Sequence, residues 1–150
     1  MDANRYINKI REIIFNEFNF LTKMGYSYSN YTIQKKMHLH LLEIIYKSSE
    51  YKKEVAISAS ISLNSNNEFY ITSSISNIPY KDVNDFISFD MYLKKILHIE
   101  TNTAIKLYKM ESDIELIDGQ VRAYADLFKK EGSSLIASHK KFSGLYPEWT

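Results

Sequence analysis

Two histidines stand two positions apart, at His38 and His40, and have the clearest potential for metal chemistry in this chain. On a strand, this spacing places both imidazoles on one face, where they could bind Zn or Ni. A site needs two further ligands, yet Glu43 has the opposite parity, and His98 and His139 lie far along the sequence. We therefore reject a metal site and interpret the pair as strand-edge histidines.

Acidic residues, serines and glycines form no recognisable catalytic motif. The acidic residues gather where two helices are expected to begin, near Asp82 and Glu115, and the helix dipole explains them there. No serine stands in the Gly-x-Ser-x-Gly pattern of hydrolases, and the 4 glycines form no phosphate-binding loop. We expect no cofactor and no enzymatic activity, with a paired-carboxylate enzyme as the alternative.

The strongest pattern is an alternation of apolar and small polar residues in two neighbouring segments, 55–63 and 69–76. Such alternation predicts strands with one buried face. The connection between them is rich in Asn and Ser, which favour turns. A loop with an odd number of residues keeps apolar side chains opposite one another. We therefore predict a three- or five-residue connection that pairs Ile61 with Ile71 and Ser60 with Thr72.

The polar side of this hairpin is a row of hydroxyls, which is either solvated or a contact surface for a partner. Small hydroxyl side chains lose little entropy on burial, which suits a binding surface. A tyrosine-rich segment before the hairpin either packs over the sheet edge or anchors a protein interface. The candidate binding residues are Ser58, Ser60, Ser62, Tyr70, Thr72 and Ser74 on the hairpin and Tyr26, Tyr28 and Tyr31 in the segment.

The N-terminal half predicts a helix followed by a sheet. An apolar stripe at three- and four-residue spacing predicts a helix over 3–24, with Gly25 as its left-handed cap. The segment 26–36 is predicted as loop or weak strand. Residues 38–47 have two partly apolar faces, as in a central strand. Together with the hairpin, this strand predicts an antiparallel meander of three or more strands.

The C-terminal half predicts helices. Asp82 is a candidate N-cap for a helix to about Leu97, and the segment 101–110 is ambiguous between strand and helix. Ser112 and Glu115 form a capping-box pattern that begins a long helix, with Gly132 as its end. The residues expected to face inward are Val83, Phe86, Ile87, Met91 (or Phe89) and Leu93 in the first helix and Ile114, Ile117, Val121, Tyr124 and Phe128 in the second. The aromatic tail over 135–150, which includes Trp149, is expected to dock on the domain.

Composition limits the remaining possibilities. The chain of 150 residues predicts one α+β domain, with the sheet covered on one face by the N-terminal helix and the C-terminal helices. A net charge of +1 argues against nucleic acid and membrane surfaces as partners. The chain has no long apolar run, no signal-peptide pattern and no cysteine, so we expect a cytoplasmic protein.

The order of the predicted elements along the chain resembles that of a known group of proteins. The opening helix ends Phe20-Leu21-x-x-x-Gly25-Tyr26, the sheet runs from Leu41 to Ile75, and helices follow. This order resembles small cytosolic α+β proteins of bacteria, including immunity proteins that neutralise the toxins of competing strains. The resemblance implies a non-enzymatic protein-binding module that acts by steric occlusion. The alternatives are a small-molecule-binding protein or enzyme with a pocket between sheet and helices, and a homodimer built on an exposed strand edge.

Overall fold

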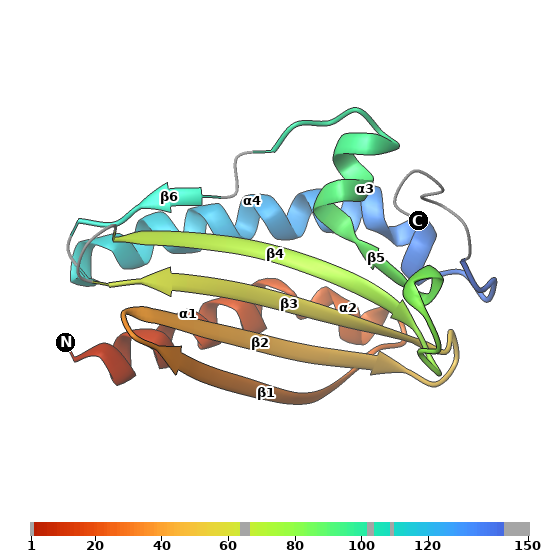
Figure 1. Ribbon diagram of the computed structural model, residues 1–150, viewed down its shortest axis with the longest axis horizontal. Helices are drawn as coiled ribbons and strands as arrows, with labels where there is room; N and C mark the ends of the chain where they lie inside the picture. The colour runs from red at the N-terminus through yellow and green to blue at the C-terminus, as the bar shows by residue number, and fades with distance from the viewer. Residues whose placement is uncertain (1, 64–66, 102–103, 109, 143–150) are drawn as a thin grey trace.

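The computed structural model describes residues 2–63, 67–101, 104–108 and 110–142, which form helices and one antiparallel sheet. The helices are α1 (Ala3–Glu17), α2 (Phe20–Lys23), α3 (Phe89–Lys95) and α4 (Met110–Ile136), and a 3-10 turn covers Val83–Asp85. The strands are β1 (Ser27–Lys36), β2 (Leu39–Ser48), β3 (Lys53–Ser62), β4 (Glu68–Asn77), β5 (Phe86–Ser88) and β6 (Ala104–Lys106). The predicted α+β class is confirmed (Figure 1).

The sheet is an antiparallel meander in the order β1-β2-β3-β4-β5, and β6 also pairs with β4. The short strands β5 and β6 contact opposite ends of β4, whose residues 71–73 have neither of them as a partner (Figure 1). The sequence leaves 26–36 undecided, and this segment is the ten-residue edge strand β1. Every residue of β1 is exposed, so it lacks the apolar alternation that reveals a strand.

The predicted hairpin register is correct in parity and wrong by two residues. Ile61 pairs with Phe69, and Ser60 pairs with Tyr70. Five positions, 63–67, separate the last paired residues, which agrees with one of the two predicted loop lengths. A shift of two residues leaves every side chain on its predicted face, so the apolar pattern cannot detect it. The backbone N–H of Leu63 leaves the ladder and donates to the carbonyl of His38.

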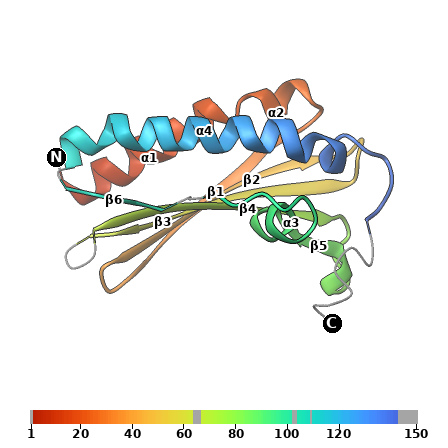
Figure 2. The ribbon, with the colours of Figure 1, turned by 90° about the horizontal axis from the view of Figure 1, so that it is seen from above.

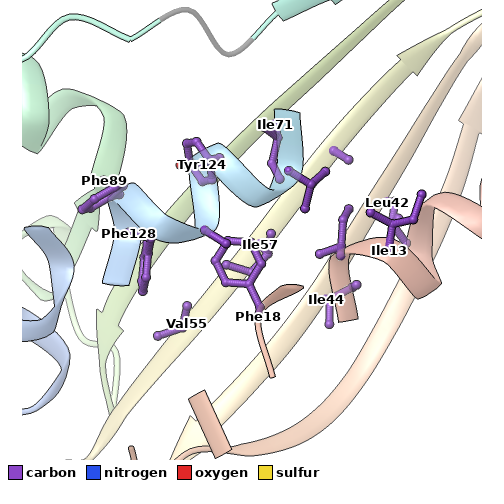
Figure 3. Close-up of a cluster of buried hydrophobic side chains, with 14 of the residues drawn as sticks. Ile13, Phe18, Leu42, Ile44, Val55, Ile57, Ile71, Phe89, Tyr124 and Phe128 are labelled. Atoms are coloured by element: carbon purple, nitrogen blue, oxygen red, sulfur yellow. The ribbon is translucent and has the colours of Figure 1, made fainter. Parts of the chain in front are cut away.

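Helices cover one side of the sheet. α1, α2 and α4 lie on the same side, and in the described part of the chain no helix packs on the opposite side of β1–β4 (Figure 2). The core between these layers is a set of buried aromatic and aliphatic side chains (Figure 3). Phe18, Phe89 and Phe128 form its aromatic centre, with ring centroids 4.7 to 5.8 Å from that of Phe128.

The predicted first helix is divided into α1 and α2. Asp2 caps α1 by accepting a hydrogen bond from the backbone N–H of Arg5 at 2.8 Å. At Asn19 the chain tightens into three-residue hydrogen bonds, which turn it toward the sheet while Phe18 and Leu21 stay buried. Gly25 has a φ of 91° and ends the segment, as its left-handed conformation predicts.

The helix predicted over 82–97 is shorter and begins later. Asp82 is an N-cap, as expected, but it caps the 3-10 turn over Val83–Asp85. The chain then forms β5, where Ile87 pairs with Ile75, and α3 begins at Phe89 with Ser88 as its cap. Pairing with β4 overrides the local helical pattern here. Val83 and Phe86, which are predicted to face inward, are exposed.

The last helix, α4, is longer than predicted at both ends. It begins at Met110, before the predicted cap at Ser112, and passes through Gly132 to Ile136. Its buried stripe includes the predicted Ile117, Val121, Tyr124 and Phe128. The segment 101–110 contributes the short strand β6. Ile136 and Phe142 of the tail are buried, whereas the predicted docking of Trp149 falls outside the described residues.

The two glycines of α4 differ in their surroundings, which gives a prediction. A Cβ at Gly119 would meet nothing within 4 Å, so Gly119→Ala should stabilise the protein by about 0.5–1 kcal/mol through helix propensity. A Cβ at Gly132 would lie 3.3 Å from Cε1 of Phe89, so Gly132→Ala should gain less. Urea denaturation of both variants measures the difference. Equal gains would show that the ring of Phe89 does not restrict position 132.

Candidate functional site

The uncovered side of the sheet presents most of the predicted hydroxyls together. We call this surface, made by the outward residues of β1–β4, the hydroxyl face. Ser58 pairs with Thr72, Ser60 with Tyr70, and Ala56 with Ser74. On the other side of β3, Ser58 pairs with Glu43 of β2. The register therefore places the six predicted residues Ser58, Ser60, Ser62, Tyr70, Thr72 and Ser74 on one continuous surface.

A shallow depression of about 360 Å³ lies in the hydroxyl face. Four of its lining residues belong to the predicted set: Ser58, Ser60, Tyr70 and Thr72. Sequence reasoning missed Thr32, Gln34, Leu41 and Glu43, which also line it. Their side chains join the site because β2 pairs with β3 and β1 pairs with β2, and no local pattern in β1 predicted the second pairing. The spacing of two residues between Leu41 and Glu43 was the sequence feature that could have placed both side chains on one face of β2.

The chemistry of this depression is hydrogen bonding. Glu43 is exposed and flanked across the strands by Thr32 and Ser58. Hydroxyls and a side-chain amide can both donate and accept, whereas the carboxylate of Glu43 accepts. Leu41 adds a half-buried apolar patch. This arrangement suits contact with polar groups of another molecule.

The three tyrosines of the predicted second surface lie on the opposite, helix side. Tyr26 is buried, and its hydroxyl donates to the carbonyl of Ile136 at 2.7 Å, so of the two alternatives for this segment Tyr26 itself follows the packed one. Tyr28 and Tyr31 are each 40% exposed and belong to β1. Tyr28 packs edge-on against Phe15. Tyr31 lies under the guanidinium of Arg11 at 4.3 Å.

A second hollow, of about 410 Å³, opens beside β4 where the sheet has a gap between β5 and β6. Asp90 of α3 lines it and accepts a hydrogen bond from the backbone of Ser73 in that gap. The hydroxyl of Tyr124 donates to Asp90 at 3.2 Å and lies 2.7 Å from Oγ of Ser73. Burial raises the pKa of Asp90, while these hydrogen bonds partly oppose the shift. Lys94 and Glu100 also line the hollow.

The C-terminal segment is fixed by buried polar side chains at the end of the sheet. Lys53 is 1% exposed, and its ammonium donates to the carbonyls of Ser138 and Lys140. Burial lowers the pKa of Lys53. The amide of Asn77 donates to the carbonyl of Phe142 at 2.8 Å and to Asp85 at 3.1 Å. These contacts are sufficient to explain the buried Lys53 and Asn77 as structural.

Asp85 gives a prediction about acid stability. The hydrogen bond from Asn77, followed by that from the Lys81 backbone, lowers the pKa of Asp85 to about 2. A folded-state pKa below the ordinary value means that Asp85 stabilises the fold above about pH 4 and loses this effect between about pH 4 and pH 2. Asp85→Asn should therefore be less stable than the wild type at pH 7, with a smaller difference at about pH 2.5. Denaturation at both values measures this, and a difference independent of pH would contradict it.

The two histidines do not share the geometry that the sequence predicts. His38 lies in the turn between β1 and β2, whereas His40 is a buried residue of β2 with its pKa lowered by burial. Among the described residues, no three His, Cys, Asp or Glu side chains gather closely enough to hold a metal ion. Within the same ranges, none of the helices combines the length and apolarity needed to span a membrane.

Comparisons with known proteins give no match. No family model matches the chain, and neither a curated protein nor a solved structure matches it significantly. The surfaces that bear on its function are therefore the hydroxyl face, the hollow at Asp90 and the outer edge of β1.

Proposed function

We propose that this protein is a non-enzymatic protein-binding module that blocks a partner by steric occlusion, as an immunity protein does. The observation that carries the proposal is the hydroxyl face, which the helices leave uncovered across four long strands. The face extends over four strands of ten residues each, and its shallow depression suits a protruding segment of a protein partner. We place this activity in the cytoplasm, where a chain without cysteine needs no disulfides.

The composition of the face supports a protein partner. Serine and threonine lose little side-chain entropy on binding, and the β-sheet already fixes their backbones. Glu43 is the one carboxylate that lines the depression among the described residues, so a partner with a basic or amide side chain there would gain a charge-assisted hydrogen bond. Tyr70 at the rim of the depression is 41% exposed and supplies an aromatic contact of the kind that anchors interfaces.

The test compares three tagged proteins in affinity capture from the source cells. The wild type should retain one stoichiometric partner. The double variant Ser58→Arg/Thr72→Arg fills the depression with charge and should lose that partner at least tenfold. The control Ser134→Arg alters an exposed position of α4 and should retain it. Circular dichroism must show that all three are folded. Retention by the double variant, or no stoichiometric partner for the wild type, would contradict the proposal.

The hollow at Asp90 favours a second candidate function, the binding of a small molecule. Asp90 and Glu100 can hold an ammonium group, while Lys94 can hold a carboxylate. Met91 and Ile99 add apolar walls. These groups suit a small zwitterion such as a free amino acid, and the volume of about 410 Å³ lies in the range of ligand sites.

Thermal unfolding with each of the common amino acids tests this second candidate. One compound should raise the Tm of the wild type in a concentration-dependent way, because ligand binding stabilises the folded state. Asp90→Asn retains the size of the side chain and should lose the shift. If no amino acid shifts the Tm, or if Asp90→Asn responds equally, then the hollow does not bind this class.

A further inference from the structure

Within the described part of the chain, the outer edge of β1 is free along the whole strand. β1 is first in the strand order, so only one of its edges pairs with β2. Its ten residues are all exposed. A long edge strand presents backbone N–H and C=O groups that can pair with another strand, and proteins normally obstruct such edges.

The obstructions in β1 lie at its two ends. A bulge interrupts the register between Tyr28 and Asn30, and the charges Lys35 and Lys36 close the other end. The central run over 30–34 contains no charge, no proline and no glycine. This run is therefore open to pairing by another strand.

Exposed apolar side chains follow the same edge on the helix side. Phe15 of α1 and Tyr28, Tyr31 and Ile33 of β1 are each 39 to 41% exposed. Phe15 and Tyr28 also line a hollow of about 390 Å³ together with Arg11, Glu12 and Asn16. The free backbone and the apolar side chains thus mark the same edge as a contact surface, which is separate from the hydroxyl face.

We propose that a second copy of this chain pairs its β1 with this β1 in antiparallel orientation, with Thr32 on the two-fold axis. This register places Tyr31 of each copy opposite Ile33 of the other, an aromatic and β-branched pair on the helix side. Asn30 then faces Gln34 on the outer side. Two such pairs of each kind form because an isologous interface repeats every contact.

The charge distribution favours a second copy in this orientation. Parallel pairing in register would place Lys35 and Lys36 against their own copies, and this repulsion is destabilising. Antiparallel pairing moves Lys35 to the level of Ser29 of the second copy. That position lies next to Tyr28, beside the hollow that both Arg11 and Glu12 line, so the ammonium meets one charge of each sign there and no second lysine of the strand. The antiparallel orientation thus separates the lysines of the two copies, whereas the parallel orientation brings them together.

The pairing has a structural consequence that does not depend on the proposed function. A two-fold axis between antiparallel strands is perpendicular to the sheet, so both helix layers lie on one side. Both hydroxyl faces then lie on the other side, in one continuous sheet. A protein that bound partners through those faces would bind two of them in the same direction.

The test uses the lack of cysteine in the wild-type chain. Light scattering with gel filtration should show a dimer of the wild type that dissociates on dilution. Mild oxidation should cross-link Thr32→Cys, because residues opposite one another across antiparallel strands have Cα atoms about 4.5–5.5 Å apart, within disulfide range. Gln34→Cys should not cross-link, because the two positions lie about 13 Å apart along the strands.

A charge variant completes the test. Tyr31→Lys/Ile33→Lys brings four ammonium groups together at the axis and should give a monomer. The control Val83→Lys, at a 68% exposed position outside β1, should remain a dimer. A wild type that stays monomeric up to millimolar concentration would overturn the proposal. So would a dimer that survives the double variant, or cross-linking of the Gln34→Cys variant in place of the Thr32→Cys variant. If Tyr31→Lys/Ile33→Lys is a monomer that still captures the partner, the dimer is supported and the proposed function does not depend on it.

Discussion

Phe128→Ala is expected to lower the free energy of unfolding by about 3–5 kcal/mol, as deletion of a fully buried phenylalanine does elsewhere. Phe128 is 0% exposed and contacts the rings of Phe18, which lies between α1 and α2, and of Phe89 in α3 (Figure 3). It also contacts the ring of Phe20 in α2. Its removal leaves a cavity where these elements meet. The loss approaches the total stability of many domains, about 5–15 kcal/mol, so the variant should be near unfolding.

Urea denaturation measures this loss as a lower midpoint with an unchanged slope. Phe86→Ala is the matched control, because it deletes the same atoms from a ring that is 39% exposed. The control should cost clearly less than Phe128→Ala, since part of the Phe86 ring is already in contact with water and its deletion leaves no enclosed cavity. A small loss for Phe128→Ala, or equal losses for the two variants, would contradict the aromatic centre described for the core.

The parts of the fold that sequence predicts well are those in which burial repeats with the period of the element. The stripe Ile117, Val121, Tyr124 and Phe128 of α4 and the alternation in β3 and β4 are examples, because each has one buried face. β1 has no buried residue and therefore no such signal. The segment 82–97 has a helical pattern, but pairing of Ile87 with Ile75 across the sheet determines its conformation.

The candidate sites are likewise predictable only where their residues share a face by sequence spacing. The hydroxyls of Ser58, Ser60 and Thr72 share a face by parity alone, so sequence predicts them. Glu43 joins them because β2 pairs with β3, as the predicted meander requires, but both faces of β2 are partly apolar and so did not mark Glu43 as part of the site. Thr32 joins them only through β1, a segment that the sequence left undecided. The contact of Asp90 with Tyr124 links residues 34 positions apart. The helix dipole explains acidic residues near the start of a helix. For this reason the sequence did not single out Asp90, although it lies against the buried hydroxyl of Tyr124.

Tyr124→Phe is expected to lower the free energy of unfolding by about 1–3 kcal/mol, the cost of leaving buried polar groups unpaired. The ring stays in place against Phe18 and Phe89, so packing is retained. The hydroxyl is lost, and with it the hydrogen bonds to Ser73 and to both carboxylate oxygens of Asp90. Because Asp90 is already poorly solvated, the lost donor leaves its charge less compensated.

Tyr6→Phe is the matched control for this change. The hydroxyl of Tyr6 is buried and has no hydrogen-bond partner among the described residues, and burial raises its pKa to about 12. Removing it should leave the stability unchanged or slightly higher, since no hydrogen bond is broken. If both variants lost the same stability, the loss would come from the removal of a hydroxyl in general and not from the contact with Asp90.

The pH dependence identifies the partner of the Tyr124 hydroxyl. A carboxyl whose folded-state pKa is raised destabilises the fold where it must be ionised. This cost decreases as pH falls below that pKa and is gone below the ordinary pKa of the carboxyl. The hydrogen bond from Tyr124 lowers the pKa of Asp90, so its loss should raise that pKa further above the ordinary value. The cost of Tyr124→Phe should therefore be greater at pH 7 than at about pH 4. In the background of Asp90→Asn, which cannot ionise, the cost should be the same at both values. A cost that did not change with pH in either background would assign the effect to Ser73 alone.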